Sequence, residues 1–125
     1  MVDVICDSSF LIQLCTRRIK NIDNLDVEIG QLKFVVPTTV KQELKKLCNI
    51  PSKKQKVLTT IEKIKKFPRV QLSGNFADDI ILSYIKKEGG MVATMDKELK
   101  LKVKKSGGSV ISISNDKIVL ESSKI

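Results

Sequence analysis

The chain alternates short apolar runs rich in β-branched residues with longer segments whose apolar residues recur at helical spacing. We expect strands at residues 2–6, 33–36, 70–72, 91–94 and 110–113, with an edge hairpin strand at 117–120. Helices are expected at 10–20, 38–47, 53–66, 76–87 and 97–105, with a weaker one at 22–29 and a threonine, Thr38 or Thr39, capping the second. This alternation predicts a three-layer α/β/α fold around a twisted, mainly parallel sheet.

Length and hydropathy favour one domain spanning residues 1–125. The chain has 125 residues, 42% of them hydrophobic, which is enough for a single buried core. No apolar run approaches the roughly 20 residues of a membrane helix, and the first residues lack the pattern of a signal peptide. We therefore expect a cytoplasmic protein.

The residue types present argue against several kinds of active site. The chain has no histidine, and its three cysteines form no CxxC pair. A zinc site, a disulfide framework and Ser-His-Asp or Cys-His catalysis are therefore disfavoured. Carboxylates, lysines and hydroxyls remain as the groups that can carry chemistry.

Four acidic residues occupy related positions in the expected fold. Asp7 and Asp96 each come after an apolar strand, so in a parallel sheet both should emerge at its carboxyl edge. Asp78 begins a helix, and Glu43 lies about one turn into another, so both can face that edge. Taken singly, the aspartates are better explained as helix caps or helix-start residues, and Glu43 as a solvated helix residue.

Taken together, four clustered carboxylates would repel one another unless a cation lay between them. Oxygen ligands of this kind suit Mg²⁺ or Mn²⁺, which bind through a few carboxylates, waters and substrate phosphate oxygens. Neighbouring helical residues diverge by about 100°, so only one of Asp78 and Asp79 can point at such an ion. We expect Asp78 to do so.

The chain is strongly basic, with a formal net charge of +9. Such a charge attracts polyanions, and nucleic acid is the natural class of partner. Paired lysines along helices are equally typical of solvated faces, so charge alone leaves both explanations open. On the last expected helix, the lysines that could hold RNA phosphates near Asp96 are Lys97, Lys100, Lys104 and Lys105.

Several ordered segments resemble the acidic motifs of PIN-domain nucleases. They are the strand before Asp7-Ser8-Ser9, Val36-Pro37 leading to Glu43-Leu44, Ala77-Asp78-Asp79-Ile80-Ile81, and Val92-Ala93-Thr94-Met95-Asp96-Lys97-Glu98-Leu99. The resemblance covers nearly the whole chain and is nearest to stand-alone archaeal and ribosomal-RNA-processing PIN proteins. It departs from the family at Met95, where an asparagine is common.

This resemblance implies a Mg²⁺- or Mn²⁺-dependent endoribonuclease. Metal binding and catalysis would fall to Asp7, Glu43, Asp78 and Asp96, with support from Ser8, Ser9, Asp79 and Thr94. The cellular role would be that of a toxin-like enzyme held by an antitoxin, or of a processing enzyme acting in a pre-ribosomal particle. A homodimer is a further expectation from the family.

Two other functions remain as alternatives. One is a catalytically inactive RNA-binding or assembly module that kept the fold. The other is a phosphatase or phosphoacceptor built on Asp7, which is disfavoured because Ser9 stands where such proteins usually carry a second acid.

Overall fold

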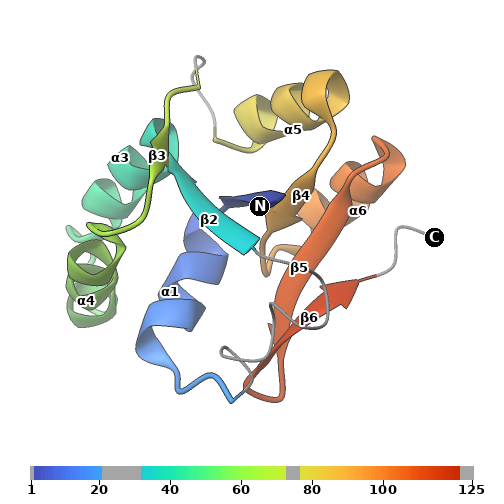
Figure 1. Cartoon of the computed structure of the whole chain (residues 1–125). Coiled ribbons are helices and arrows are strands. Elements are labelled where there is room, and N and C mark those ends of the chain that lie inside the picture. The colour runs from blue at the N-terminus through green and yellow to red at the C-terminus, as the bar shows by residue number, and fades with distance from the viewer. Residues whose placement is uncertain (1, 21–31, 73–76, 122–125) are drawn as a thin grey trace.

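The computed structural model describes residues 2–20, 32–72 and 77–121 (Figure 1). The weaker helix expected at 22–29 and the turn expected at 73–75 lie outside these residues. Among the helices that are described, none is long and apolar enough to cross a membrane.

A six-stranded sheet forms the centre of the fold, in the order β3-β2-β1-β4-β5-β6. All neighbouring strands are parallel except β5 and β6, which are antiparallel. The strands are β1 (Val2–Cys6), β2 (Leu32–Pro37), β3 (Arg69–Val70), β4 (Met91–Ala93), β5 (Ser109–Ser114) and β6 (Lys117–Glu121). The predicted α/β class with a mainly parallel sheet is therefore confirmed.

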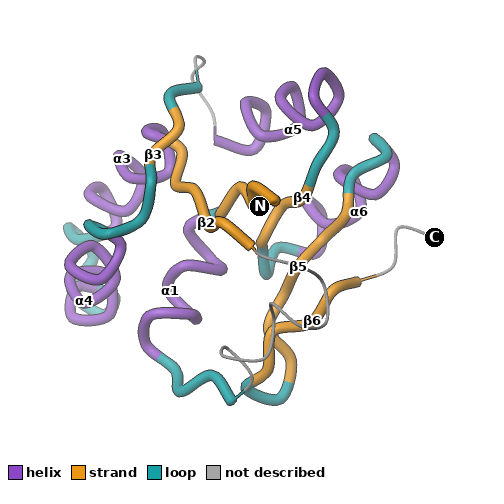
Figure 2. Tube along the Cα trace, in the orientation of Figure 1, coloured by secondary structure: helices purple, strands orange, loops and turns teal. Residues whose placement is uncertain are grey.

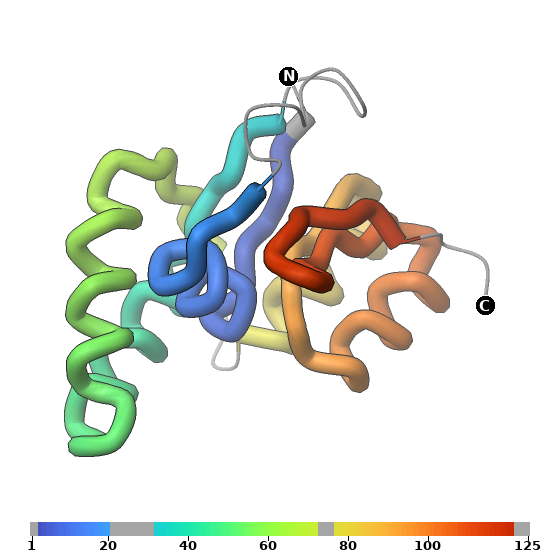
Figure 3. The backbone as a smooth tube through the Cα atoms, turned by 90° about the horizontal axis from the view of Figure 1, so that it is seen from below, coloured from blue at the N-terminus to red at the C-terminus, as the bar shows by residue number. Residues whose placement is uncertain are grey.

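Helices cover both faces of this sheet (Figures 1–3). They are α1 (Ser8–Thr16), α3 (Thr38–Leu47), α4 (Lys54–Ile64), α5 (Ala77–Glu88) and α6 (Lys97–Lys105). The chain moves outward from β1 to β2 and β3, with α1, α3 and α4 on one face. It then returns to β4 and moves on to β5, with α5 and α6 on the other face. Right-handed crossovers require this change of face when the direction of winding reverses.

Three local predictions differ from the structure. The first helix ends at Thr16, so Arg17 is its C-cap and the basic residues beyond it lie outside the helix. The N-cap of α3 is Pro37, without a side-chain cap bond, because the Thr38 hydroxyl instead donates to the backbone oxygen of Val70 at 3.4 Å. The third strand begins earlier than expected because residue 69 pairs with β2.

The core lies on both sides of the central strands. Val4, Ile5 and Cys6 of β1 are fully buried, as are Val92 and Ala93 of β4, because parallel strands are covered on both faces. The expected edge hairpin is present, and Asn115 and Asp116 in its turn have φ values of 53° and 60°. A two-residue turn with both φ values positive matches the twist of antiparallel strands.

Candidate active site

A cleft of about 320 Å³ opens where β1 and β4 lie side by side. The winding of the chain reverses between these two strands, and ligands of open α/β sheets bind at such a point, beyond the carboxyl ends of the strands. The residues that line the cleft are Asp7, Ser8, Ser9, Glu43, Ala77, Asp78 and Asp96. All four acids singled out from the sequence therefore face one cleft.

Asp7 is the most constrained of these acids. It directly follows β1, caps α1, and is only 5% exposed. Its Oδ1 accepts a hydrogen bond from the Ser8 N–H at 2.7 Å. Its Oδ2 accepts from the hydroxyls of Ser9 at 2.9 Å and Thr94 at 2.7 Å. Such bonds to the ionised form offset the cost of burying the charge.

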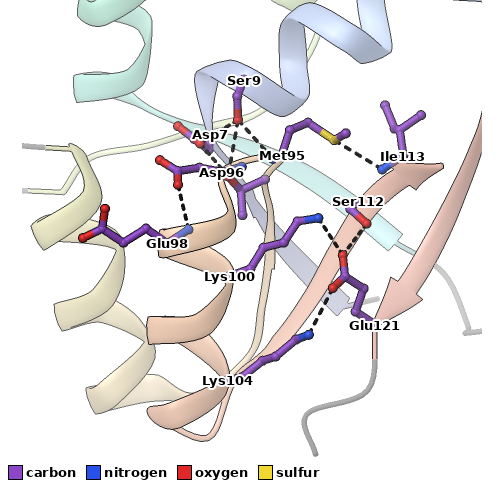
Figure 4. A network of polar contacts seen from close by, with 11 residues as sticks. Asp7, Ser9, Met95, Asp96, Glu98, Lys100, Lys104, Ser112, Ile113 and Glu121 are labelled. Carbon is purple, nitrogen blue, oxygen red and sulfur yellow. Dashed lines mark hydrogen bonds and ion pairs between the residues drawn. The ribbon is translucent and has the colours of Figure 1, made fainter. Parts of the chain in front are cut away.

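The same hydroxyls connect Asp7 to the segment after β4 (Figure 4). Ser9 Oγ accepts from the Met95 N–H, and Thr94 Oγ1 accepts from the Asp96 N–H, both at 3.1 Å. Asp96 in turn caps α6, where its Oδ1 accepts from two backbone N–H groups of the first turn. The orientations of the two aspartates are thus coupled through Ser9 and Thr94.

Met95 also takes part in packing near the cleft. Its sulfur accepts from the Ile113 N–H at 3.4 Å, and its side chain packs against the core. Methionine therefore occupies the position between Thr94 and Asp96 as a largely apolar residue. The backbone N–H that meets Ser9 does not depend on the side chain at this position.

Glu43 reaches the cleft from α3. Val40 and Leu44 turn toward the core, and this rotation leaves Glu43 half-buried beside the start of α1. The Ser8 hydroxyl donates to Glu43 Oε1. Ser8 therefore contacts both Asp7 and Glu43, whereas Ser9 contacts Asp7, and their sequence positions alone did not indicate this difference.

Asp78 and Asp79 both occupy the first turn of α5, but only Asp78 lines the cleft. Partial burial raises the pKa of Asp78 from 3.8 to about 6, with further contributions from the charges of Asp7, Asp96 and Glu43. The four carboxylates therefore repel one another across the cleft. Bringing them together costs free energy that a bound cation would offset.

The donor set of the cleft suits a hard cation that keeps part of its water shell. All its charged groups are carboxylates, which are ligands that Mg²⁺ and Mn²⁺ accept. In the described parts of the chain, no three acidic, cysteine or histidine side chains are arranged to hold one ion directly. Mg²⁺ usually binds proteins through one or two carboxylates and several waters, so it does not need three side chains that reach the ion directly.

The lysines of α6 differ in their surroundings. Lys100 and Lys104 both pair with Glu121 of β6, at 2.8 and 3.0 Å (Figure 4). Lys97 and Lys105 are exposed. Two of the four cations expected to meet RNA thus already have a carboxylate partner.

Lys102, which lies on α6 near the cleft, is not among the lysines predicted from the sequence to meet RNA. Its ammonium pairs with Glu98 at 3.1 Å, one turn earlier. The pKa of Lys102 is raised first by this hydrogen bond and also by the charges of Asp78 and Asp79. The Glu98–Lys102 spacing of four residues was the signal available in the sequence.

Comparisons with known proteins agree with this fold. The family model described as "PIN like domain" matches residues 4–115. Ribonuclease VapC4 of Methanocaldococcus jannaschii is 32% identical over 127 residues, with 94% of each chain covered.

Two solved structures are also similar. The PIN domain endonuclease Utp24 superimposes with a TM-score of 0.77 at 28% identity, over 95% of this chain and 90% of that one. A domain of a functionally unknown protein from Methanocaldococcus jannaschii shares the fold, with a TM-score of 0.62 at 14% identity over 91% and 92% of the two chains. With a family match that spans nearly all of its sheet and helices, the chain belongs to the PIN-like domain family.

Proposed function

We propose that this protein is a divalent-metal-dependent endoribonuclease that hydrolyses RNA phosphodiester bonds. The observation that carries the proposal is the convergence of Asp7, Glu43, Asp78 and Asp96 on one cleft. The names of two relatives, a ribonuclease and a PIN domain endonuclease, support RNA as the substrate and internal cleavage as the reaction.

Some side chains of the cleft would bind the metal ion, and others orient the side chains that bind it. Asp7, Glu43, Asp78 and Asp96 would hold Mg²⁺ or Mn²⁺. When bound, such an ion neutralises charge on the phosphodiester and lowers the pKa of a water molecule. The hydroxyls of Ser9 and Thr94 keep Asp7 in one orientation, which preserves the spacing of the acids as substrate enters.

Ser8 orients Glu43 in the same way. Its hydroxyl donates to Glu43 Oε1, and its own backbone N–H donates to Asp7. Asp79 does not line the cleft, so its contribution would be to the negative charge at the start of α5.

The inactive-module alternative is weaker because it gives no reason for the acids to stay together. A protein that only binds RNA would gain from replacing a carboxylate such as Asp78, whose pKa is raised by partial burial and by the charges of three other acids. Four carboxylates would also repel RNA phosphates unless a cation intervened. The phosphoacceptor alternative remains disfavoured because Ser9 hydrogen-bonds Asp7 where a second acid would be needed.

A cleavage assay on single-stranded RNA tests the proposal. We expect products with Mg²⁺ or Mn²⁺ and none with EDTA. Asp7→Asn and Asp96→Asn should each reduce the rate by at least about 100-fold, because each removes a metal-binding carboxylate. Asparagine is as good a helix cap as aspartate, so both variants should keep their helices.

Asp3→Asn is the matched control, because Asp3 is exposed on β1 and does not line the cleft. Full activity of this variant, with loss in the other two, supports the proposal. Equal cleavage by Asp7→Asn, Asp96→Asn and the parent protein would refute it, and absence of cleavage by the parent protein with either metal would favour the inactive module.

The two cellular roles differ in the partner they require. A toxin-like ribonuclease should arrest growth when expressed alone, and a cognate antitoxin should restore growth. A processing enzyme should sediment with pre-ribosomal particles and leave growth unaffected. The homodimer expected from the family is tested separately by measuring the mass in solution.

A further inference from the structure

Cations gather where α3, α4 and β3 meet, away from the acidic cleft. Lys41, Lys65 and Arg69 line one groove, together with Val36, Ile61 and Ile64. Lys45 lies one turn after Lys41 on α3, and residues four apart are neighbours on a helix. We call the four residues Lys41, Lys45, Lys65 and Arg69 the basic surface.

The positive charge of the basic surface is largely uncompensated. Within the part of the chain that the structure describes, its one carboxylate contact joins Lys65 to Glu62 at 2.8 Å, and their side chains are 61% and 73% exposed. Exposed ion pairs of this kind contribute little to stability. Across residues 2–20, 32–72 and 77–121, no ion pair involves Lys41, Lys45 or Arg69.

The pKa of Lys41 indicates that the cations of the basic surface lie close together. It is lowered by partial desolvation and further by the charges of Arg69, Lys45 and Lys65. The cations therefore lie close enough to repel one another. A bound polyanion would relieve this repulsion and release its own counterions.

The lysines of α6 present a contrast. Lys100 and Lys104 share Glu121, and Lys102 is paired with Glu98. Two carboxylates thus pair with these three cations, whereas among the described residues a single exposed carboxylate pairs with the four cations of the basic surface.

The basic surface lies within reach of a strand bound in the cleft. Val35 of β2 pairs with Ile5 of β1, and the next residue, Val36, pairs with Arg69 of β3. Strands are about 4.8 Å apart, so Arg69 lies about 10 Å across the sheet from the end of β1. On α3, Glu43 and Lys41 flank the buried stripe on opposite sides, so this helix borders both the cleft and the basic surface.

We propose that Lys41, Lys45, Lys65 and Arg69 form a docking surface for the phosphate backbone of RNA flanking the segment held in the cleft. The proposal rests on the proposed function in taking RNA as the polyanion. An acidic protein partner fits less well, because the apolar residues of the groove are buried or half-buried and offer no exposed anchor. Backbone recognition needs only cations spaced along a surface.

The test measures RNA binding without cleavage. A labelled single-stranded RNA of about 20 nucleotides and mixed sequence is titrated in EDTA at several salt concentrations. The variant combines Lys41→Gln, Lys65→Gln and Arg69→Gln. Its control combines Lys53→Gln, Lys54→Gln and Lys56→Gln, which removes the same charge from exposed positions at the start of α4.

We expect the surface variant to bind about tenfold more weakly or worse at low salt, with a salt slope smaller by about 2 for three lost contacts. The control should bind like the parent protein. Lys45→Glu alone, at an exposed position where folding is not at risk, should also weaken binding. Equal loss in the surface variant and the control would show a net-charge effect only and overturn the proposal, as would unchanged binding in both.

A second arm uses poly-glutamate as the ligand. Tighter binding of this polymer than of RNA, lost in the surface variant, would overturn the proposal in favour of an acidic protein partner. Because the titrations contain EDTA, they are independent of catalysis. Loss of binding in the surface variant together with full cleavage by Asp7→Asn would retain the docking surface and refute the proposed function.

Discussion

Asp78→Asn should stabilise the metal-free protein while removing its activity. The pKa of Asp78 is raised from 3.8 to about 6, first by partial burial and then by the charges of Asp7, Asp96 and Glu43. Each pKa unit corresponds to about 1.4 kcal/mol, which gives an upper bound of about 3 kcal/mol at neutral pH. Asp78 is more than a third exposed, so solvent screening reduces the expected gain to about 1 kcal/mol.

The sign follows from proton linkage. Between pH 3.8 and about 6 the folded state binds more protons at Asp78 than the unfolded state does. The destabilisation of the folded state by the ionised Asp78 carboxylate is therefore absent below pH 3.8 and complete above about pH 6. Asp78→Asn should stabilise the protein at pH 7.5 and give little gain at pH 3.5.

The measurement is thermal or urea unfolding in EDTA, and a gain of about 1 kcal/mol corresponds to about 3 °C in melting temperature. Asp79→Asn is the matched control, because it loses the same favourable charge at the start of α5 without lying in the cleft. Excess Mg²⁺ should remove the difference between Asp78→Asn and the parent protein. If Asp78→Asn is no more stable than Asp79→Asn at pH 7.5, the inferred repulsion across the cleft is wrong.

Two further substitutions test one contact between α6 and β6 and one contact in the cleft. Glu121→Gln should destabilise the protein by about 1–2 kcal/mol at neutral pH, measured by urea unfolding, because Lys100 and Lys104 lose their shared carboxylate. Burial raises the pKa of Glu121, but hydrogen bonds from these lysines outweigh it and lower the pKa from 4.5 to about 2. The loss of stability in Glu121→Gln should therefore shrink as the pH falls from 4.5 to about 2. An equal loss of stability at both pH values would contradict this. Thr94→Val should lower cleavage by about 10–100-fold by removing a hydrogen bond to Asp7, whereas Thr94→Ser should retain activity; equal rates would refute the orienting role.

The sequence predicted the cleft best where an acid follows a strand. Asp7 and Asp96 come after β1 and β4, and the carboxyl ends of adjacent parallel strands lie at one edge whatever the details of packing. The approach of Glu43 was harder to predict, because it depends on the rotation of α3 and on a bond from Ser8 that is distant in sequence.

The lysines of α6 show what local patterns omit. They were expected either to hold RNA phosphates or to form a solvated face, but two of them pair with Glu121 of the last strand. Likewise, Thr38 or Thr39 was expected to cap α3, but the N-cap is Pro37 and the Thr38 hydroxyl donates to the backbone of β3. In each case the partner belongs to another element of the fold, so propensity and spacing within one segment carry no information about it.

The bond between Thr94 and Asp7 determines when the cleft can form while the chain is being synthesised. These residues are 87 positions apart, and they become neighbours only when β4 docks beside β1. While the chain is still emerging from the ribosome, Asp7 has neither this hydroxyl nor Asp96 beside it. The cleft is thus assembled only after most of the chain has been translated, so a nascent chain next to ribosomal and messenger RNA carries an incomplete set of acids.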